Sequence, residues 1–267
     1  MGRRDPVALS PPGRLYFWGE RVLYLGPGLP AGVHSHHAVQ VCIPLSGSVR
    51  LRAGPSERWR SYTGAWIASD ASHESDLPVP LIATFWLAPE TAEARRLAPP
   101  DAGAAIRSLP RSQLAAVVPR LREGWREGYG SRRAAALLQD VVQAVGVRDR
   151  PASAIDGRVA RALEIQAAAP ERRVSLAVTA ARVALSPWWL AHLFARELGI
   201  PPRRHLLWLR LRDAVEELAR GASITRAAHV AGFADGAHLC RTFRRMLGFP
   251  PSSAVRVSKF VQDGAAP

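Results

Sequence analysis

The 267-residue sequence predicts an α+β protein in which an N-terminal β-barrel is followed by a largely helical second half. Two observations support this prediction. From Leu15 to Leu87, short apolar or aromatic runs are separated by Gly, Pro and Ser, the spacing expected of strands in a small barrel or sandwich. After Pro99 the composition shifts to Ala, Leu, Arg and Glu, and apolar residues recur every three or four positions, as in amphipathic helices.

Turn residues delimit the expected strands. The Ser-Gly-Ser sequence at 46–48, between VQVCIPL and VRLR, predicts a hairpin turn, and Ala-Gly-Pro-Ser at 53–56 closes the next strand. We therefore expect the barrel domain to occupy residues 1–100.

Two helices are expected directly after the barrel. Residues 111–129 and 132–147 both carry apolar positions at helical spacing and together predict a helical hairpin. We assign residues 101–150 to this helical linker and expect it to form the dimer interface. The stretch 148–157 contains Pro, Ser and Gly and predicts a short connection to a C-terminal helical domain at 156–260.

The C-terminal domain contains a strong signal for the start of a helix at Ser186-Pro187. A serine can cap a helix, proline suits the first helical position, and Gly199 ends the helix. The shorter amphipathic segment 175–185 lies just upstream, so the pair predicts a helix-turn-helix unit. The residues expected to pack inward are Leu190, Leu193 and Phe194.

The same pattern occurs a second time near the C-terminus. Ser223 caps one helix, Gly232 permits a tight turn and Asp235 caps the helix that follows. The amphipathic segment 203–220 joins the two units and would hold them at a fixed distance. Two such units in one domain are much more specific than one.

Charge favours a polyanionic partner for this domain. The chain has 36 Lys and Arg against 22 Asp and Glu, a formal charge of +14, and from Arg158 onward 17 basic residues face 8 acidic ones. A bias of the genome towards arginine codons would also account for the excess of arginine in the composition.

Cysteine content and hydropathy predict a cytoplasmic protein. Cys42 and Cys240 are the only cysteines and lie far apart, so the sequence offers neither a disulfide framework nor a CxxC metal site. No apolar run reaches the length of a signal peptide or a membrane span, and no membrane partner is expected.

The C-terminal residues resemble the DNA-binding domain of the AraC/XylS family of transcription regulators. The resemblance spans about residues 158–256 and rests on two sets of positions in the family pattern. These are Ser186, Leu190, Phe194 and Gly199 in the first unit, and Ala228, Gly232, Phe233, Phe243 and Gly248 in the second. Ala227, Leu239 and Pro250 depart from the residues that the family usually has.

The resemblance implies that the second helix of each unit enters a major groove of double-stranded DNA, about 34 Å apart on one face. Arg241 is the strongest candidate for reading a base or clamping a phosphate, because a guanidinium can grip guanine at two points. One of Trp188 and Trp189 is expected in the core, and the alternative role of Arg196, Arg244 and Arg245 is a solvated face or phosphate contacts. The DNA-binding positions that the family pattern implies are Trp188, Ala191, His192, Arg196, Gly236, Ala237, Cys240 and Arg241.

The barrel sequence resembles the cupin motifs. The run from Gly28 to Gly47 has the spacing of the first motif, with Gln40 where glutamate is usual, and the second motif is partial around Gly64 and His73. Two histidines at i and i+2 on a strand share a face, and a third from a neighbouring strand completes a site. The residues that could hold a divalent metal or an organic effector are therefore His34, His36, Gln40 and His73. His37 is expected to point outward.

We therefore predict a homodimeric regulator that binds DNA in response to a small molecule or metal in the barrel. RNA polymerase is a further candidate partner, and the sequence leaves activation or repression open. One alternative is a cupin metalloenzyme with a helical appendage, but Gln40 removes the usual carboxylate ligand and no cofactor is certain, so we expect no enzyme. Another is a DNA-binding protein whose barrel serves only for oligomerisation.

Overall fold

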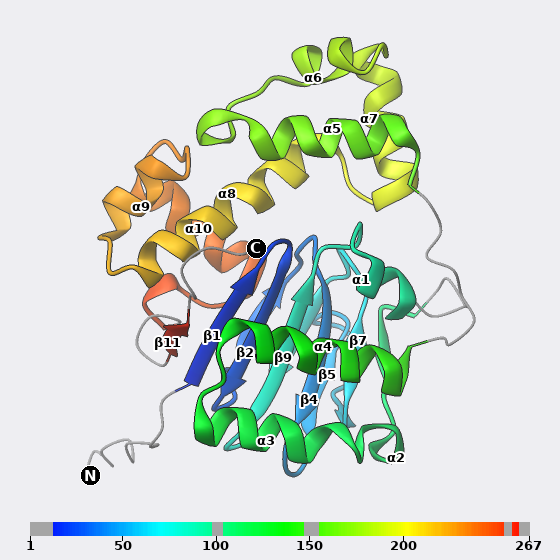
Figure 1. The fold of residues 1–267 in the computed structure, drawn as a ribbon, viewed down its shortest axis with the longest axis vertical. Helices are drawn as coiled ribbons and strands as arrows, with labels where there is room; N and C mark the ends of the chain where they lie inside the picture. The colour runs from blue at the N-terminus through cyan, green and yellow to red at the C-terminus, as the bar shows by residue number, and fades with distance from the viewer. Residues whose placement is uncertain (1–12, 98–103, 147–154, 254–257, 262–267) are drawn as a thin grey trace.

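The computed structural model describes residues 13–97, 104–146, 155–253 and 258–261. A β-rich N-terminal part carries a helical C-terminal part on one end, so the predicted α+β class is confirmed (Figure 1). Most of the connection expected at 148–157 lies outside the described residues, and Gly157 already begins a helix. Within the described residues, no helix is both long and apolar enough to cross a membrane.

Two sheets form the barrel. The larger has the strand order β10-β7-β4-β9-β2-β1-β11 and the smaller the order β3-β8-β5-β6. The strands are β1 (Gly13–Trp18), β2 (Arg21–Gly26), β3 (Ala31–His34), β4 (Val39–Pro44), β5 (Val49–Arg52), β6 (Arg60–Tyr62), β7 (Ala65–Ile67), β8 (His73–Asp76), β9 (Ile82–Leu87), β10 (Ile106–Ser108) and β11 (Ser258–Val261).

The hairpin predicted at 46–48 is wrong. Strands β4 and β5 flank this turn but belong to different sheets, since β4 pairs with β7 and β9 while β5 pairs with β6 and β8. The turn is instead a corner at which the chain crosses between sheets. All six residues of β4 are buried, because the strand is central in its sheet and covered on both faces.

Short helices cover the outer face of the larger sheet (Figure 1). They are α1 (Ala92–Leu97), α2 (Arg111–Leu114), α3 (Val117–Glu127) and α4 (Ser131–Val145). The predicted helical hairpin is present, with its first helix divided in two. The apolar side of α4 lies in the same core as the barrel strands, and its buried residues are Ala134, Leu137, Leu138, Val141, Val142 and Val145.

The C-terminal part consists of two small helical bundles joined by one long helix. Its helices are α5 (Gly157–Ala168), the 3-10 turn η1 (Pro170–Arg172), α6 (Leu176–Arg182), α7 (Pro187–Leu198), α8 (Pro202–Ala219), α9 (Ile224–Val230) and α10 (Gly236–Leu247). The first bundle has its own core around Leu190 and Phe194, and the second around Phe233 and Phe243. The helix α8 extends between them, as the sequence predicts.

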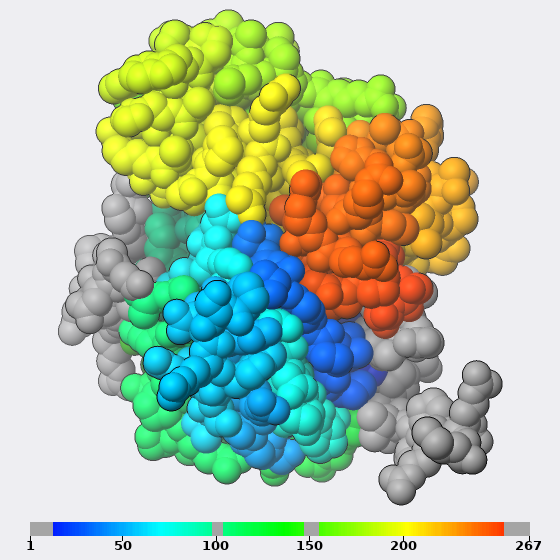
Figure 2. Space-filling view, turned by 180° about the vertical axis from the view of Figure 1, so that it is seen from behind, coloured from blue at the N-terminus to red at the C-terminus, as the bar shows by residue number. Residues whose placement is uncertain are grey.

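The helical part is docked on the barrel through α8 and the end of α10 (Figure 2). The Gly32 amide donates to the Gly248 carbonyl at 3.1 Å, and Arg204 of α8 pairs with Asp70. Gly248 adopts φ +78°, and a Cβ there would lie 2.7 Å from the Gly32 oxygen, so only glycine allows this approach. Strand β11 also returns from the helical part to pair in parallel with β1.

We predict that Leu138→Ala lowers the free energy of unfolding by about 2–5 kcal/mol, because it leaves a cavity between α4 and the sheet. Urea denaturation followed by circular dichroism measures the change. The control is Gln143→Ala, an exposed position on the same helix, which should change stability by less than about 0.5 kcal/mol. Equal losses in the two variants would contradict the burial of Leu138 between α4 and the sheet.

Candidate nucleic-acid interface and barrel histidine site

The first helix-turn-helix unit consists of α6 and α7. The Ser175 hydroxyl accepts a hydrogen bond from the Val178 amide, and Ser186 accepts one from the Trp189 amide, both at 3.1 Å. Both helices therefore begin at serine caps, and Pro187 occupies the first turn of α7.

The exposed side of α7 carries an aromatic cluster. Trp188 is 71% exposed and Trp189 38%, so the expectation that one of them belongs to the core is wrong. The ring of Trp188 stacks on His192 at 5.7 Å with an interplanar angle of 9°. Arg196, one turn further, is exposed and pairs with Glu197, whereas Ala191 is half-buried. The helix thus presents stacked rings and a basic group to solvent.

The second unit consists of α9 and α10. Ser223 and Asp235 cap these helices by accepting from the amides of Arg226 and His238. The turn between them requires Gly232, which has φ +76° and whose Cβ would lie 2.2 Å from the Glu171 carbonyl oxygen.

The solvent side of α10 is small and weakly polar apart from its arginines. Ala237 and Arg241 are exposed, and Gly236 and Cys240 are half-buried. Arg241 has no acidic side chain within ion-pairing distance in the part of the chain that the structure describes. Its guanidinium is therefore available to an anionic partner.

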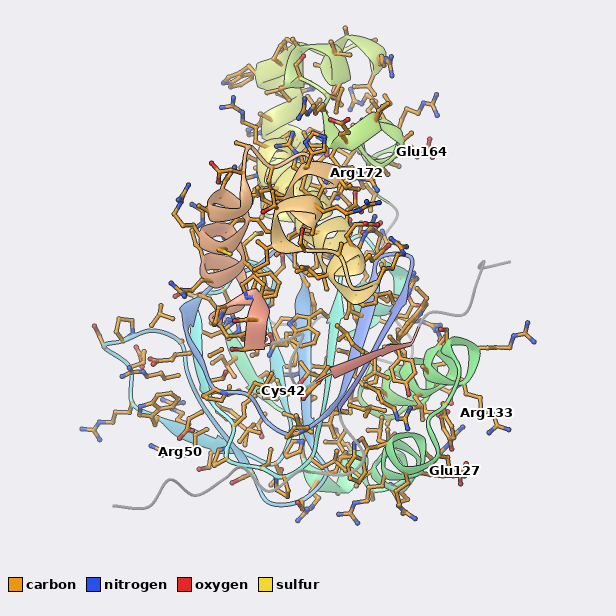
Figure 3. The ribbon with its side chains drawn as sticks, turned by 90° about the vertical axis from the view of Figure 1, so that its left-hand side faces the viewer. Cys42, Arg50, Glu127, Arg133, Glu164 and Arg172 are labelled. Atoms are coloured by element: carbon orange, nitrogen blue, oxygen red, sulfur yellow. The ribbon has the colours of Figure 1, made fainter. Side chains whose placement is uncertain are left out.

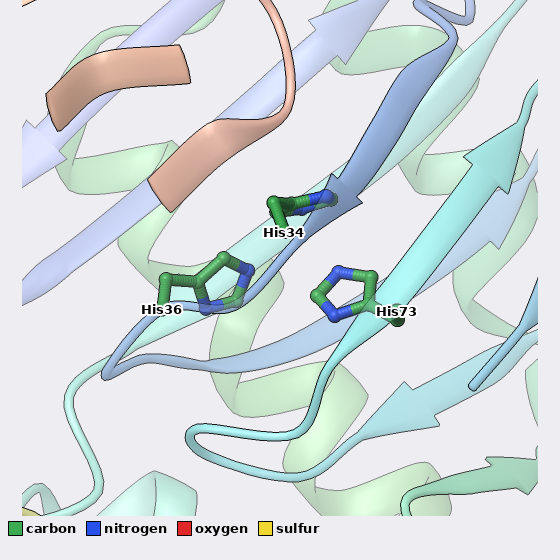
Figure 4. A group of neighbouring side chains, drawn as sticks. All are labelled: His34, His36 and His73. Carbon is green, nitrogen blue, oxygen red and sulfur yellow. The ribbon is translucent and has the colours of Figure 1, made fainter. Parts of the chain in front are cut away.

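The structure brings His34, His36 and His73 together inside the barrel (Figure 4). His34 pairs with His73 across β3 and β8, and their ring centroids lie 4.0 Å apart. His36 follows β3 and lies 5.2 Å from His73, ring to ring. All three side chains are buried, and each can turn one nitrogen toward the centre of the group.

Backbone carbonyls fix the orientation of these rings. The Nδ1 atoms of His34, His36 and His73 lie 2.7–2.9 Å from the carbonyl oxygens of Gly32, Ala38 and Ala71. A carbonyl can only accept, so each Nδ1 carries the proton and each Nε2 presents a lone pair. His73 Nε2 has no hydrogen-bond partner among the described residues. Burial lowers the pKa of all three imidazoles, that of His36 to about 3, so they are neutral.

Gln40 contributes an oxygen to the same group. Trp86 Nε1 donates to Gln40 Oε1 at 3.0 Å, which fixes which end of the amide is oxygen, and His36 Nε2 lies 2.8 Å from that oxygen. The lone pairs of His36 Nε2 and Gln40 Oε1 therefore face each other, and they repel unless a cation lies between or beside them. Three neutral imidazoles and an amide oxygen are ligands that divalent transition metals accept, so the residues present fit such an ion.

An apolar cavity of about 110 Å³ borders the histidine group. Barrel residues form one side and residues of α8 and α10 the other, a feature that the sequence did not reveal. Its wall includes Phe17, Trp86, Trp208, Leu211, Val215 and Phe243. His34, Gln40 and Arg212 add polar atoms at the boundary. Cys42, inside the barrel (Figure 3), is a buried free thiol, and burial raises its pKa to about 11, so the thiol is inert.

His37 corrects another expectation. It points away from the barrel histidines, as its place in the sequence suggests, but it is fully buried rather than outside. Its Nε2 lies 3.0 Å from a carboxylate oxygen of Glu90, and its ring lies 5.3 Å from that of His205 on α8. No local pattern indicates this contact, because His205 is 168 positions away in the chain.

The C-terminal part contains two capped helix pairs joined by one connecting helix, and the second helix of each pair carries basic or aromatic groups. This arrangement is that of DNA-binding domains with two helix-turn-helix motifs. A family profile described as "Helix-turn-helix domain" matches residues 179–256. The C-terminal domain of this chain is therefore an AraC-type helix-turn-helix domain, as the sequence predicts.

The chain is also similar over this domain to the "Uncharacterized HTH-type transcriptional regulator YidL" of Escherichia coli K12. The two are 32% identical over 87 residues, which is 32% of this chain and 29% of the relative. The matched region thus spans less than a third of that protein's length.

Solved structures share the whole two-part architecture. ToxT from Vibrio cholerae O395 superposes with a TM-score of 0.58 at 11% identity, over 89% of this chain and 96% of that one. An unsaturated fatty acid-bound ToxT from Vibrio cholerae strain SCE256 gives a TM-score of 0.56 at 8% identity, over 92% and 97%. These similarities extend the fold assignment to the β-rich N-terminal part.

We predict that Asp235→Ala lowers the free energy of unfolding by about 1 kcal/mol, because the His238 amide loses its acceptor at the start of α10. Asp235→Asn is the control and should retain most of this stability, since asparagine caps equally well. Urea denaturation followed by circular dichroism compares the two. An Asn variant as unstable as the Ala variant would contradict the capping role.

Proposed function

We propose that this chain is a sequence-specific DNA-binding transcription regulator controlled by a small molecule or metal bound in or beside the barrel. The observation that carries the proposal is the apolar cavity that barrel strands and the helix between the two helix-turn-helix units enclose together. An occupant of this cavity contacts both parts at once. It can therefore shift the balance between conformations that differ in DNA affinity.

The two second helices supply the contacts to DNA. We place α7 and α10 in successive major grooves, about 34 Å apart along one face of the duplex. Arg241 reads guanine or grips a phosphate, and the Trp188 and His192 rings offer apolar contact to thymine methyl groups. Because α10 presents few hydrogen-bonding groups, we assign most of the recognition of the DNA sequence to α7.

The cavity favours a predominantly apolar effector. Its wall is aromatic and aliphatic, with Arg212 and His34 at its boundary, a combination that suits a hydrocarbon body with one polar or acidic end. One of the ToxT structures of the same fold holds an unsaturated fatty acid. We therefore take a long-chain acid as the first probe for this cavity.

The histidine group at the edge of the cavity is the proposed metal site. His34, His36 and His73 would supply three imidazole nitrogens and Gln40 an amide oxygen. A bound ion would stabilise the β3–β8 pairing and polarise any ligand group that reaches it. The absence of a carboxylate from this group argues against the alternative of a cupin metalloenzyme.

We also propose that the protein forms a homodimer, that RNA polymerase is a partner and that the protein acts in the cytoplasm. The apolar sides of α3 and α4 are buried within the chain, so a dimer through residues 111–147 would use their outer, polar surface. Figure 3 shows Glu127 and Arg133 projecting from this surface. Analytical ultracentrifugation at micromolar concentration tests the dimer, and a monomer would contradict it.

Genome-wide pull-down of DNA fragments with the purified full chain tests the proposed function. We expect a compact recovered motif, and Arg241→Ala should weaken binding to it by about 5- to 150-fold, because a bidentate contact contributes about 1–3 kcal/mol. Fluorescence anisotropy at fixed salt measures the affinity.

The matched control for that variant is Arg58→Ala, which removes the same charge from an exposed site on the barrel. This variant should bind within about two-fold of the parent protein. If no motif is recovered with or without added zinc and fatty acid, the assignment as a specific regulator is wrong.

We predict that Val215→Phe fills the cavity from α8 and abolishes effector binding. An unsaturated long-chain fatty acid should raise the thermal midpoint of the parent protein but not that of this variant. Val230→Phe, an exposed position on α9, is the control and should keep the shift. Equal shifts in all three proteins would show that the acid binds elsewhere.

A further inference from the structure

A second group of potential metal ligands lies where the two parts of the molecule meet. Glu90, just after β9, extends one carboxylate oxygen to His37 Nε2 at 3.0 Å and the other to His205 Nε2 at 3.2 Å. The three donor atoms lie within 4.8 Å of one another. His37 and His205 are at most 2% exposed and the Glu90 side chain is 11% exposed, so both imidazoles are buried and the group reaches solvent only at Glu90.

The protonation of His205 is defined by its neighbour on α5. The Gln166 side-chain amide donates to the Pro202 carbonyl, which turns its oxygen toward His205 Nδ1 at 2.6 Å. An amide oxygen only accepts, so Nδ1 of His205 carries a proton. The Nε2 of a neutral His205 is then a lone pair facing a Glu90 oxygen.

A carboxylate and an imidazole lone pair this close repel each other unless a cation, either a proton on Nε2 or a metal ion, lies between them. His37 Nδ1 has no hydrogen-bond partner among the described residues, and Nε2 is the ring nitrogen that faces Glu90.

We propose that His37, Glu90 and His205 bind a divalent transition metal such as Zn²⁺ at the interface between the barrel and the DNA-binding domain. Two imidazoles and a carboxylate are a common ligand set for zinc, with solvent completing the coordination. Ligands about 2.0–2.1 Å from a tetrahedral ion lie about 3.3 Å from one another. The distances from the Glu90 oxygens to His37 Nε2 and His205 Nε2, 3.0 and 3.2 Å, are close to this value. The bond from His205 Nδ1 to Gln166 then orients the ligand from outside.

This site is distinct from the DNA, effector and barrel-metal sites proposed above. His36 and His37 are neighbours in the chain but face opposite ways, one into the barrel and the other toward α8. Because His37 and Glu90 come from the barrel and His205 from α8, an ion here binds tightly only while the two parts are docked. Binding must therefore stabilise the docked arrangement.

Zinc content per chain tests the proposal, with zinc alone as the probe. The full chain, the barrel-site variant His34→Ala/His73→Ala, and each of these with Glu90→Gln are dialysed against buffered free zinc and assayed by mass spectrometry. We expect Glu90→Gln to remove one zinc ion in either background, and His205→Gln to do the same. This result is independent of whether the barrel histidines bind zinc, and independent of DNA binding.

The control is His192→Ala/His229→Ala, which removes two exposed histidines and should leave the zinc content unchanged. Zinc should also raise the thermal midpoint of the barrel-site variant by about 5 °C, and His205→Gln should abolish this rise. Folded Glu90→Gln and His205→Gln proteins that retain their full zinc content would overturn the proposal.

A spectroscopic measurement avoids any change at the interface, should the Glu90 or His205 variants fail to fold. X-ray absorption at the zinc edge of the barrel-site variant should show two imidazoles and no sulfur in the first shell. A shell with fewer than two imidazoles, or a variant that binds no zinc, would overturn the proposal equally.

Discussion

The packing of α8 against the open end of the barrel is the contact on which the rest of the arrangement depends. This helix connects the two helix-turn-helix units, so a contact that fixes α8 also fixes the position of both units. Trp208 enters the barrel end with its ring 6.2 Å from that of His36 and 6.4 Å from that of His37. Ion pairs from Arg204 to Asp70 and from Arg212 to Glu20 flank it. The barrel thereby fixes the helix that joins the two helix-turn-helix units, in addition to its contact with the end of α10.

The same contact explains why the cavity lies at the interface rather than in the middle of the barrel. Bulky side chains of α8 and α10 cap an apolar barrel mouth without filling it, and Phe243 belongs both to the core of the second unit and to the cavity wall. A ligand bound there would contact α10 directly through Phe243. In the proposed function, no long pathway of coupled residues is then needed between the effector and this helix.

The sequence predicted the features that depend on local chemistry. Serine and aspartate caps, the glycine turn at Gly232 and the apolar stripe of each helix can be recognised within about fifteen residues, and the structure has them where they were expected. Features that depend on tertiary contacts were missed. The corner at 46–48 resembles a hairpin because turn residues do not specify which sheet the next strand joins. Both tryptophans of α7 are exposed because Leu190, Leu193 and Phe194 already fill the core on that helix.

The adjacent residues His36 and His37 show most clearly which features the local sequence does not predict. Alternation along an extended chain correctly separates His36 from His37, but it cannot say what each side faces. A barrel domain considered alone would leave His37 in solvent, whereas in the intact chain α8 covers it and supplies His205 as its neighbour. A buried histidine needs polar partners, and here Glu90 serves both rings at once. The barrel interior and the domain interface are therefore lined by two adjacent residues, one peptide unit apart.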